Sequence, residues 1–364
     1  MEFIRPEHYS PGKLKTAQGK SYGIGIIGCG SIANSAHLPA YRKHGLPIAA
    51  CCDVSEQAAK ATAEKFGIPF WTTDVRELLQ QEEVGIIDLA IHPEPRLGVL
   101  RQIAEAPRPV LCQKPLALDL QHARELAREA DRLGIVLGVN QQARWAPAHK
   151  ALKTVLEQDL IGHVYSIHHH MRAFQDQPGW WWTTMKNFNI VDHGVHYADL
   201  CRHFNPSQEE WSRVHCTTAQ LPGQNAVDPL IYSASVEFGP AGGRNPLMAS
   251  LHFNNIVKAS RSHSHTWWVD GTEGSVWCTQ DTLYMALNRH KNVIHEIKLK
   301  GSWFPDAFAG SMIAFINEVS EGRKPPVTAE DNLQTIALTT AMVLSSQEGR
   351  VVERMDVLEG SVSL

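Results

Sequence analysis

The first half of this 364-residue chain alternates short apolar runs with stretches of helical character, and this pattern constrains the fold most. An apolar run at 22–27 leads through a glycine-containing turn into a helix-compatible stretch. Further strands are expected at 48–52, 86–91, 110–112 and 135–139, with helices between them at 56–66, 74–80, 96–105 and 119–133. Such alternation requires a parallel sheet covered by helices on both faces.

The turn after the first strand has the spacing of a dinucleotide-binding loop. Gly28 allows a tight turn, Gly30 lets backbone approach a pyrophosphate, and Ala33 is small enough for helix-on-strand packing. The start of the following helix attracts the anion. The candidate cofactor contacts in this loop are Gly28, Cys29, Gly30, Ser31 and Ile32.

Asp53 ends the second strand, at about the 20-residue spacing expected after such a loop. Its carboxylate would accept hydrogen bonds from the adenosine ribose hydroxyls and repel a 2′-phosphate. The expected cofactor is therefore NAD in preference to NADP. The alternative is a purely structural turn in which Asp53 caps a helix.

Lys114 follows the strand at 110–112, and ligands of open α/β sheets lie beyond the carboxyl ends of the strands. Pro115 stiffens the backbone there. Lys114 is therefore a candidate to contact both the cofactor and a substrate hydroxyl. Held between them, its ammonium can donate a hydrogen bond to the oxygen that gains negative charge as hydride leaves carbon. A solvated surface lysine is the alternative.

After residue 139 the pattern changes to a helix at 149–158 and then short runs separated by Gly, Pro, Asn and Asp turns. These runs predict a meandering antiparallel sheet with strands at 164–171, 211–219, 231–238, 247–253, 266–269, 275–278 and 282–286. A helix at 190–204 interrupts them, and two amphipathic helices at 307–321 and 330–346 are expected to pack on the rest of the molecule.

On the helix at 190–204, Asp192 and His196 are spaced to lie on one face, with Asp199 and His203 continuing the stripe. His196 can exchange a hydroxyl proton near neutral pH, and Asp192 can orient it or hold a substrate hydroxyl. A wetted helix face is one alternative. A metal site is another, but four ligands spread over more than two turns lie too far apart for one ion, so no metal is expected.

Four sequence features occur in this order: G-C-G-S-I-A, Asp53, Q-K-P-L-A and D-H-G-V-H. Together they resemble the glucose-fructose oxidoreductase and inositol dehydrogenase (Gfo/Idh/MocA) family, from about Tyr22 onward. The resemblance implies an NAD(P)-binding Rossmann domain with a doubly wound parallel sheet, and a second, α+β domain with a large open, mainly antiparallel sheet. It also implies that Lys114, Asp192 and His196 line the site. The expected division is an arm at 1–21, the Rossmann domain at 22–142 and the second domain at 143–364.

The chain departs from the family pattern in two places. Gln113 is neutral where the family usually has Glu before Lys-Pro. His92 begins a His-Pro-Glu-Pro turn where the family commonly has Thr-Pro or Asn-Pro followed by a histidine, so His92 is a further candidate beside the cofactor.

Additional substrate-binding candidates are Arg144, Trp145 and Arg172. For Arg144 and Trp145, structural packing at the domain junction is the competing interpretation. The Trp180–Trp182 run could close over a sugar or belong to the core or a subunit interface. In the 168–170 histidine run, strand alternation places the middle histidine opposite the other two.

The resulting hypothesis is an NAD-dependent oxidoreductase that transfers hydride between nicotinamide and a secondary alcohol of a sugar, sugar derivative or cyclitol. One alternative is a redox-neutral glycosidase that acts by oxidation and elimination with retained NAD. A second is a non-catalytic regulatory protein that binds NAD and sugar. The exposed face of the open sheet further suggests a homodimer or homotetramer.

Charge and composition limit the kinds of molecule that the protein is expected to bind. The 34 basic and 38 acidic residues give a formal net charge of −4, without the clustered Lys and Arg that nucleic-acid binding uses. No apolar run approaches the ~18 residues of a membrane span. The seven cysteines form no C-x-x-C pair, which favours reduced thiols and a cytoplasmic protein.

Overall fold

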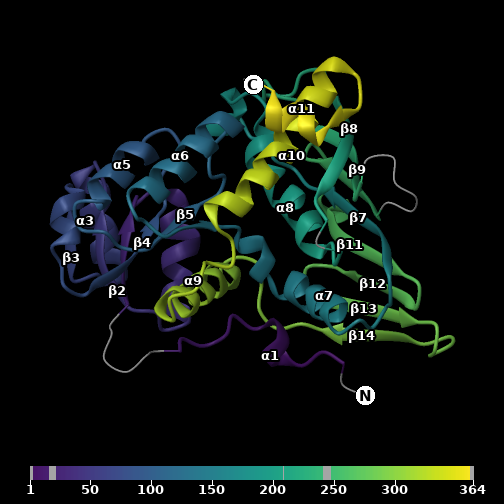
Figure 1. Ribbon diagram of the computed structural model, residues 1–364, viewed down its shortest axis with the longest axis horizontal. Coiled ribbons are helices and arrows are strands. Elements are labelled where there is room, and N and C mark those ends of the chain that lie inside the picture. Colours follow the sequence, from purple (N-terminus) through teal and green to yellow (C-terminus); the bar gives the residue numbers. More distant parts are fainter. Residues whose placement is uncertain (1–2, 16–21, 208, 241–246, 361–364) are drawn as a thin grey trace. The chain divides into compact units, whose positions relative to one another are not determined.

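The computed structural model describes residues 3–15, 22–207, 209–240 and 247–360, and the chain forms two compact units (Figure 1). The parallel-sheet unit comprises the described residues of Ser10–Ala146 and Ser302–Leu333. The open-sheet unit comprises those of Met1–Tyr9, Pro147–Gly301 and Gln334–Leu364. This grouping differs from the sequence-based limits of 22–142 and 143–364, which stay a prediction about the domains.

The parallel-sheet unit is the doubly wound sheet expected from the sequence. Its six strands lie in the order β3-β2-β1-β4-β5-β6, and each neighbouring pair is parallel. The strands are β1 (Gly23–Ile27), β2 (Ile48–Cys52), β3 (Phe70–Thr72), β4 (Val84–Leu89), β5 (Val110–Gln113) and β6 (Leu137–Asn140). The strand order reverses between β1 and β4, and ligands of such sheets lie at this reversal.

Capping residues explain where the helices of this unit begin and end. Ser55 accepts a hydrogen bond from the Ala58 amide at the start of α3 (Glu56–Phe66), which ends at Gly67 in the left-handed region. Asp119 accepts from the His122 amide at the start of α6 (Leu120–Arg132). The remaining helices are η1 (Ala33–His37), α2 (Leu38–Lys43), α4 (Val75–Leu79), α5 (Arg96–Ile103) and the short η2 (Gln142–Trp145).

Helix α9 (Asp306–Ser320) packs in the parallel-sheet unit although it comes late in the chain. Phe308 and Met312 are buried in one cluster with Ile24 and Ile26 of β1. A Cβ on Gly138 of β6 would lie 2.7 Å from the Phe315 ring, so α9 depends on a glycine for its close approach.

The open-sheet unit contains a nine-stranded sheet in the order β14-β13-β12-β11-β7-β10-β9-β8-β15. Its strands are β7 (Val164–Arg172), β8 (Trp211–Ala219), β9 (Ile231–Phe238), β10 (Leu247–Asn254), β11 (Ser264–Gly271), β12 (Gly274–Cys278), β13 (Thr282–Leu287), β14 (Ile294–Lys298) and β15 (Val352–Glu353). Most pairs are antiparallel, but β10 pairs with β7 in parallel. The sheet is therefore mainly antiparallel, as expected, and this parallel pair arises because β8 and β9 intervene before the chain returns beside β7.

One face of the open sheet is buried by helices. Helix α7 (Pro147–Glu157) contacts β12 and β13, and α8 (Val195–Phe204) contacts β7. From α10 (Ala329–Glu348), the Gln334 carbonyl accepts a hydrogen bond from Trp211 and the Ser345 hydroxyl accepts one from the Cys216 amide. Strand β10 alternates buried and more exposed residues, as expected for a sheet with one covered face.

The amino-terminal arm and the helix at 190–204 show details beyond the sequence-based expectation. In the arm, helix α1 (Pro6–Tyr9) contacts α7, and Tyr9 is buried. The interrupting helix begins with a π-helical turn, η4 (Asn189–His193), before α8. A short α11 (Arg354–Glu359) follows β15.

Candidate functional site

The glycine loop after β1 is shaped for close backbone approach. Gly28 has φ +103°, and a Cβ there would lie 2.6 Å from the Ala90 carbonyl oxygen. A Cβ on Gly30 would meet no atom within 4 Å, so the loop is open on that side. Ala33 is fully buried at the start of η1, as the spacing predicts. This arrangement fits a bound pyrophosphate.

The Asp53 carboxylate holds the glycine loop through one oxygen and the start of α3 through the other. Its Oδ2 accepts a hydrogen bond from the Cys29 amide at 2.8 Å, and its Oδ1 accepts one from the Ser55 amide at 2.9 Å. Each oxygen keeps further lone-pair capacity for a ribose hydroxyl. The residues present therefore fit an adenine dinucleotide without a 2′-phosphate.

His92 and Lys114 lie in the loops that follow β4 and β5. His92 is exposed, whereas Lys114 is half-buried and its amide donates to Oε1 of Gln113 at 3.1 Å. Gln113 itself is buried. A neutral amide thus stands beside Lys114 at this strand end, in place of the carboxylate that the resemblance implies.

Arg96 joins these two loops, a role that no local sequence motif predicts. Its buried guanidinium donates to the carbonyls of Ile91 at 2.7 Å and Leu116 at 2.8 Å, and also to that of Pro115. A charged residue in the first turn of an amphipathic helix is usually interpreted as surface. Arg96 instead fixes the backbone on either side of the loops that carry His92 and Lys114.

Arg144 and Trp145, in η2, make packing contacts inside the parallel-sheet unit. The Arg144 guanidinium lies 3.5 Å from the Asp331 carboxylate. A Cβ on Gly310 of α9 would lie 2.9 Å from the Trp145 Cβ, so Trp145 packs closely on that helix. These contacts favour the structural interpretation, and substrate binding by either residue stays a prediction.

In the open-sheet unit, Asp192 and His196 lie across a change of helix type. Asp192 is half-buried in η4 and His196 is buried in α8. The Gly194 amide donates to the Asn189 carbonyl at 3.1 Å, five residues back, so the helix is wider here. The regular α-helical turn predicted between Asp192 and His196 is therefore a π-to-α junction, a feature common at functional sites.

Two buried polar residues fix the start of this helix. The Asp228 carboxylate accepts from the amides of Asn187 at 2.9 Å and Asn189 at 3.0 Å, and Asn255 donates to the Asn189 side chain at 2.9 Å. Burial raises the pKa of Asp228. Neither Asp228 nor Asn255 was predicted, because each lies far from the helix in sequence.

The rest of the polar stripe has a structural role at Asp199. This residue is fully buried and accepts a hydrogen bond from the Thr335 hydroxyl at 3.1 Å. Within the described residues, no group of three or more His, Cys, Asp or Glu side chains is arranged to hold a metal ion.

Arg172 and the 168–170 histidines lie on β7. The Arg172 Nε donates to the Ser262 carbonyl at 3.2 Å. His169 is buried and stacks on Tyr197 with ring centroids 4.2 Å apart, whereas His168 and His170 are exposed, which confirms the predicted alternation. Burial and the neighbouring His265 and His149 hold the pKa of His169 well below its usual value.

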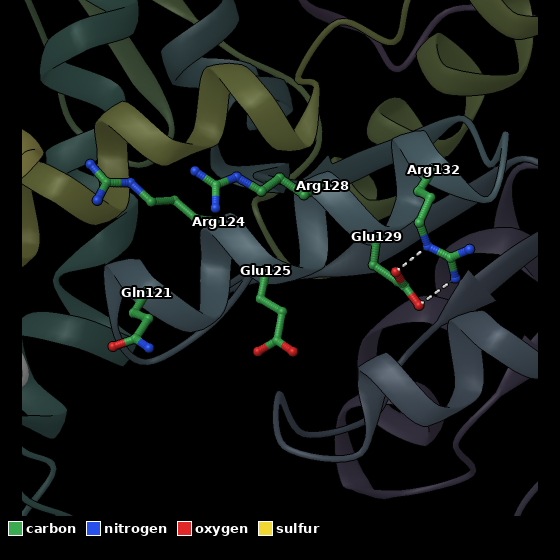
Figure 2. A pocket seen from close by; sticks show the side chains of 6 residues that line it. All are labelled: Gln121, Arg124, Glu125, Arg128, Glu129 and Arg132. Carbon is green, nitrogen blue, oxygen red and sulfur yellow. Dashed lines mark hydrogen bonds and ion pairs between the residues drawn. The ribbon is translucent and has the colours of Figure 1, made fainter.

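A surface hollow on α6 contains none of the predicted site residues. Figure 2 shows its lining, Gln121, Arg124, Glu125, Arg128, Glu129 and Arg132, all from this one helix. Hydrogen bonds from Arg132 and Arg101 lower the pKa of Glu129 to about 2. We interpret this hollow as a solvated charged helix face.

The predicted site residues thus fall into two sets. The parallel-sheet unit holds the residues after β1, β2, β4 and β5, including Asp53, His92 and Lys114. The open-sheet unit holds Arg172, Asp192 and His196. All seven cysteines are buried free thiols, and none of the helices in the described part of the chain is long and apolar enough to cross a membrane.

Known proteins resemble the chain over nearly its whole length. Among curated proteins, a D-apiose dehydrogenase of Paraburkholderia graminis is 27% identical over 90% of this chain and 88% of its own length. A myo-inositol 2-dehydrogenase of Thermotoga maritima is 22% identical over 92% of this chain and 99% of its own. A crystal structure of an Agrobacterium radiobacter oxidoreductase, in complex with NAD+, L-tartaric acid and magnesium, aligns with a TM-score of 0.79 at 21% identity. That alignment covers 92% of this chain and 99% of the other, and shows a shared fold.

Family models match both parts of the chain. Residues 22–141 match an oxidoreductase family domain described as an NAD-binding Rossmann fold. Residues 153–353 match the C-terminal alpha/beta domain of the same oxidoreductase family. The chain therefore belongs to the Gfo/Idh/MocA family of oxidoreductases, and its first part is an NAD-binding Rossmann domain.

Proposed function

We propose that the protein transfers hydride between NAD and a secondary alcohol of a sugar, sugar derivative or cyclitol. The observation that carries the proposal is the match to an NAD-binding oxidoreductase family over both parts of the chain, joined to the presence of Lys114, Asp192 and His196. When bound, NAD accepts or returns the hydride. A binding protein without chemistry would have no need of all three side chains.

Each residue has a separate role in this proposal. The Lys114 ammonium donates a hydrogen bond to the reacting oxygen and stabilises the negative charge that develops there. The His196 imidazole accepts the hydroxyl proton at a ring nitrogen, and its burial keeps bulk water from that nitrogen. Asp192 orients the imidazole or holds a neighbouring substrate hydroxyl.

The names of relatives support a polyhydroxylated substrate. Besides the D-apiose and myo-inositol dehydrogenases, a D-glucoside 3-dehydrogenase of Escherichia coli is 28% identical over 48% of this chain. These proteins are named for substrates that carry several neighbouring hydroxyls. The individual sugar depends on pocket shape.

The test is a panel of sugars, inositols and aryl glycosides incubated with NAD. Stoichiometric NADH formation would support a net oxidoreductase, whereas aglycone release without NADH would overturn it in favour of a redox-neutral glycosidase. Lys114→Ala and His196→Ala should each lose turnover by at least about 100-fold while the dissociation constant for NAD stays the same. Full activity in either variant would refute the role given to that residue.

A further inference from the structure

The segment between β7 and η4 carries an aromatic cluster with two exposed indoles. Trp180 is 43% exposed and Trp181 is 52% exposed. The Trp180 ring meets Trp182 edge-on at 4.1 Å, and Trp182 stacks on Phe188 at 5.5 Å with an angle of 7°. Trp182 is thus the support, while the other two rings present surface to solvent. Two adjacent, half-exposed indoles form a small apolar surface that suits stacking with a ligand ring.

Hydrogen bonds fix the Trp182 ring and the backbone that carries Trp180 and Trp181. The Trp182 Nε1 donates to the Gln175 carbonyl at 3.1 Å, so its polar atom is used inside the protein. The Thr183 hydroxyl donates to the Trp180 carbonyl at 2.7 Å, and the Val227 amide donates to the Thr183 carbonyl at 2.8 Å. The exposed rings are therefore presented by a fixed turn.

Two buried carboxylates attach this segment to the loop before β9. Asp176 accepts hydrogen bonds from the amides of Asn225 and Ala226, both at 2.9 Å from Oδ1. Asp228, at the other end of the segment, holds the backbone of Asn187 and Asn189. Such anchoring lowers the conformational entropy lost when a ligand binds, which is the advantage of a preorganised surface.

The cluster continues to the helix that carries the proposed catalytic residues. The Phe188 ring lies 6.1 Å from His193, the residue next to Asp192. Trp182, Phe188 and His193 therefore form a row of rings that leads from the exposed indoles to η4. All of these contacts lie inside the open-sheet unit.

We propose that Trp180 and Trp181 bind the second ring or the aglycone of a glycoside whose first ring reacts beside Asp192 and His196. A pyranose offers an apolar C–H face with polar hydroxyl edges, and indole faces flanked by polar side chains complement both. The same segment carries the exposed polar residues Gln177, Thr184 and Lys186. The substrate class is then a glycoside or disaccharide in preference to a free monosaccharide, and this rests on the proposed function.

The inference is tested by saturation-transfer NMR with phenyl β-D-glucopyranoside, and methyl β-D-glucopyranoside as the one-ring comparison, on NAD-loaded protein. Trp180→Ala and Trp181→Ala should weaken binding of the phenyl glucoside about three- to tenfold and leave the methyl glucoside unchanged. Trp181→Phe should recover most of the loss. Tyr165→Ala is the matched control, because Tyr165 is also 52% exposed but lies on β7 outside the segment.

The proposal that Trp180 and Trp181 bind a second ring would be overturned by either of two results. One is equal affinity of the parent protein for the two glucosides, and the other is an equal loss of affinity for both glucosides in the variants. A fall in molar mass of Trp181→Ala by light scattering would also overturn the proposal, since the indoles would then be a subunit contact. Turnover is read separately by NADH formation. If the phenyl glucoside still binds through Trp180 and Trp181 but no sugar yields NADH, the proposed reaction is refuted and the proposed ring-binding role of the two tryptophans is retained.

Discussion

Asp53 combines two tasks in one carboxylate, because it holds the glycine loop and is the proposed ligand of the ribose. Asp53→Asn keeps an acceptor oxygen but removes the charge that opposes a 2′-phosphate. We expect kcat/KM for NAD to fall about 10- to 100-fold and the ratio of NADP to NAD activity to rise. Steady-state kinetics with both cofactors measure this. An unchanged ratio would show that Asp53 only supports the loop.

Arg96 is expected to matter for stability and for turnover together. Arg96→Met keeps an apolar stem but leaves the carbonyls of Ile91 and Leu116 without their buried donor. The free energy of unfolding should fall by about 3 kcal/mol or more, and kcat should fall because the loop that carries Lys114 loses its tie. Urea unfolding and NADH assays measure the two effects.

Arg101→Met is the control on the same helix. Arg101 is largely exposed and pairs with Glu129 at 2.8 Å, so its loss should change stability far less. Equal effects of the two substitutions would mean that the carbonyl contacts of Arg96 contribute little.

These residues show what a sequence reveals about a site and what it does not. Asp53, Lys114 and His196 are predictable candidates because their chemistry follows from local motifs at strand ends or on one helix. Arg96 and Asp228 act on backbone groups of other segments, so nothing in their own neighbourhood indicates a role. The spacing of Asp192 and His196 predicts that they share one helix face, but the π-helical turn that contains Asp192 depends on packing that spacing does not encode.

At the scale of elements, β7, β11 and α7 bring three histidines together in the open-sheet core. His169 and His149 have ring centroids 5.2 and 5.7 Å from His265. Burial, with His149 and His193 nearby, lowers the pKa of His265 to about 3, and the pKa of His169 is lowered too. In the unfolded chain, His265 and His169 bind protons below about pH 6.5, whereas in the folded protein their imidazoles stay neutral at that pH.

Stability should therefore fall as pH drops from about 6.5 toward 3, by about 1.4 kcal/mol per pH unit for each such histidine. His265→Gln should flatten this slope, and between pH 7.5 and 5.0 the parent should lose about 2 kcal/mol more than the variant. Urea unfolding at both pH values measures it. His168→Gln, on the exposed face of β7, is the control, and an equal flattening there would contradict the explanation.

Element order was predictable in the first half because strands and helices alternate along the chain and neighbours in sequence are neighbours in space. The packing of elements was less predictable where two neighbouring elements are far apart in the sequence. The parallel pairing of β7 with β10 joins strands separated by α8, β8 and β9, and α9 packs against β6 although more than 150 residues lie between them. Hydrophobic pattern fixes which face of each element is buried, but it does not identify the partner.

At the scale of the whole molecule, the exposed face of the open sheet carries a ladder of aromatic rings. Trp268 of β11 stacks on Trp277 of β12 at 4.6 Å, and Trp277 stacks on Tyr284 of β13 at 5.3 Å. Trp268 is 40% exposed, and Met248 on β10 is also exposed. An exposed sheet face with apolar rings can contribute to the ~800 Å² per partner that a stable dimer buries.

We therefore expect a homodimer or homotetramer held through this face. Trp268→Lys should lower the molar mass measured by light scattering, because a charge buried at an interface without a partner is costly. Leu221→Lys, also at an exposed apolar residue but in the loop after β8, should leave the mass unchanged. Two results would contradict this expectation: a monomeric parent protein, or a Trp268→Lys variant with unchanged molar mass and an intact circular dichroism spectrum. The aromatic ladder would then serve the stability of the sheet, because stacked cross-strand rings also stabilise a solvent-facing sheet.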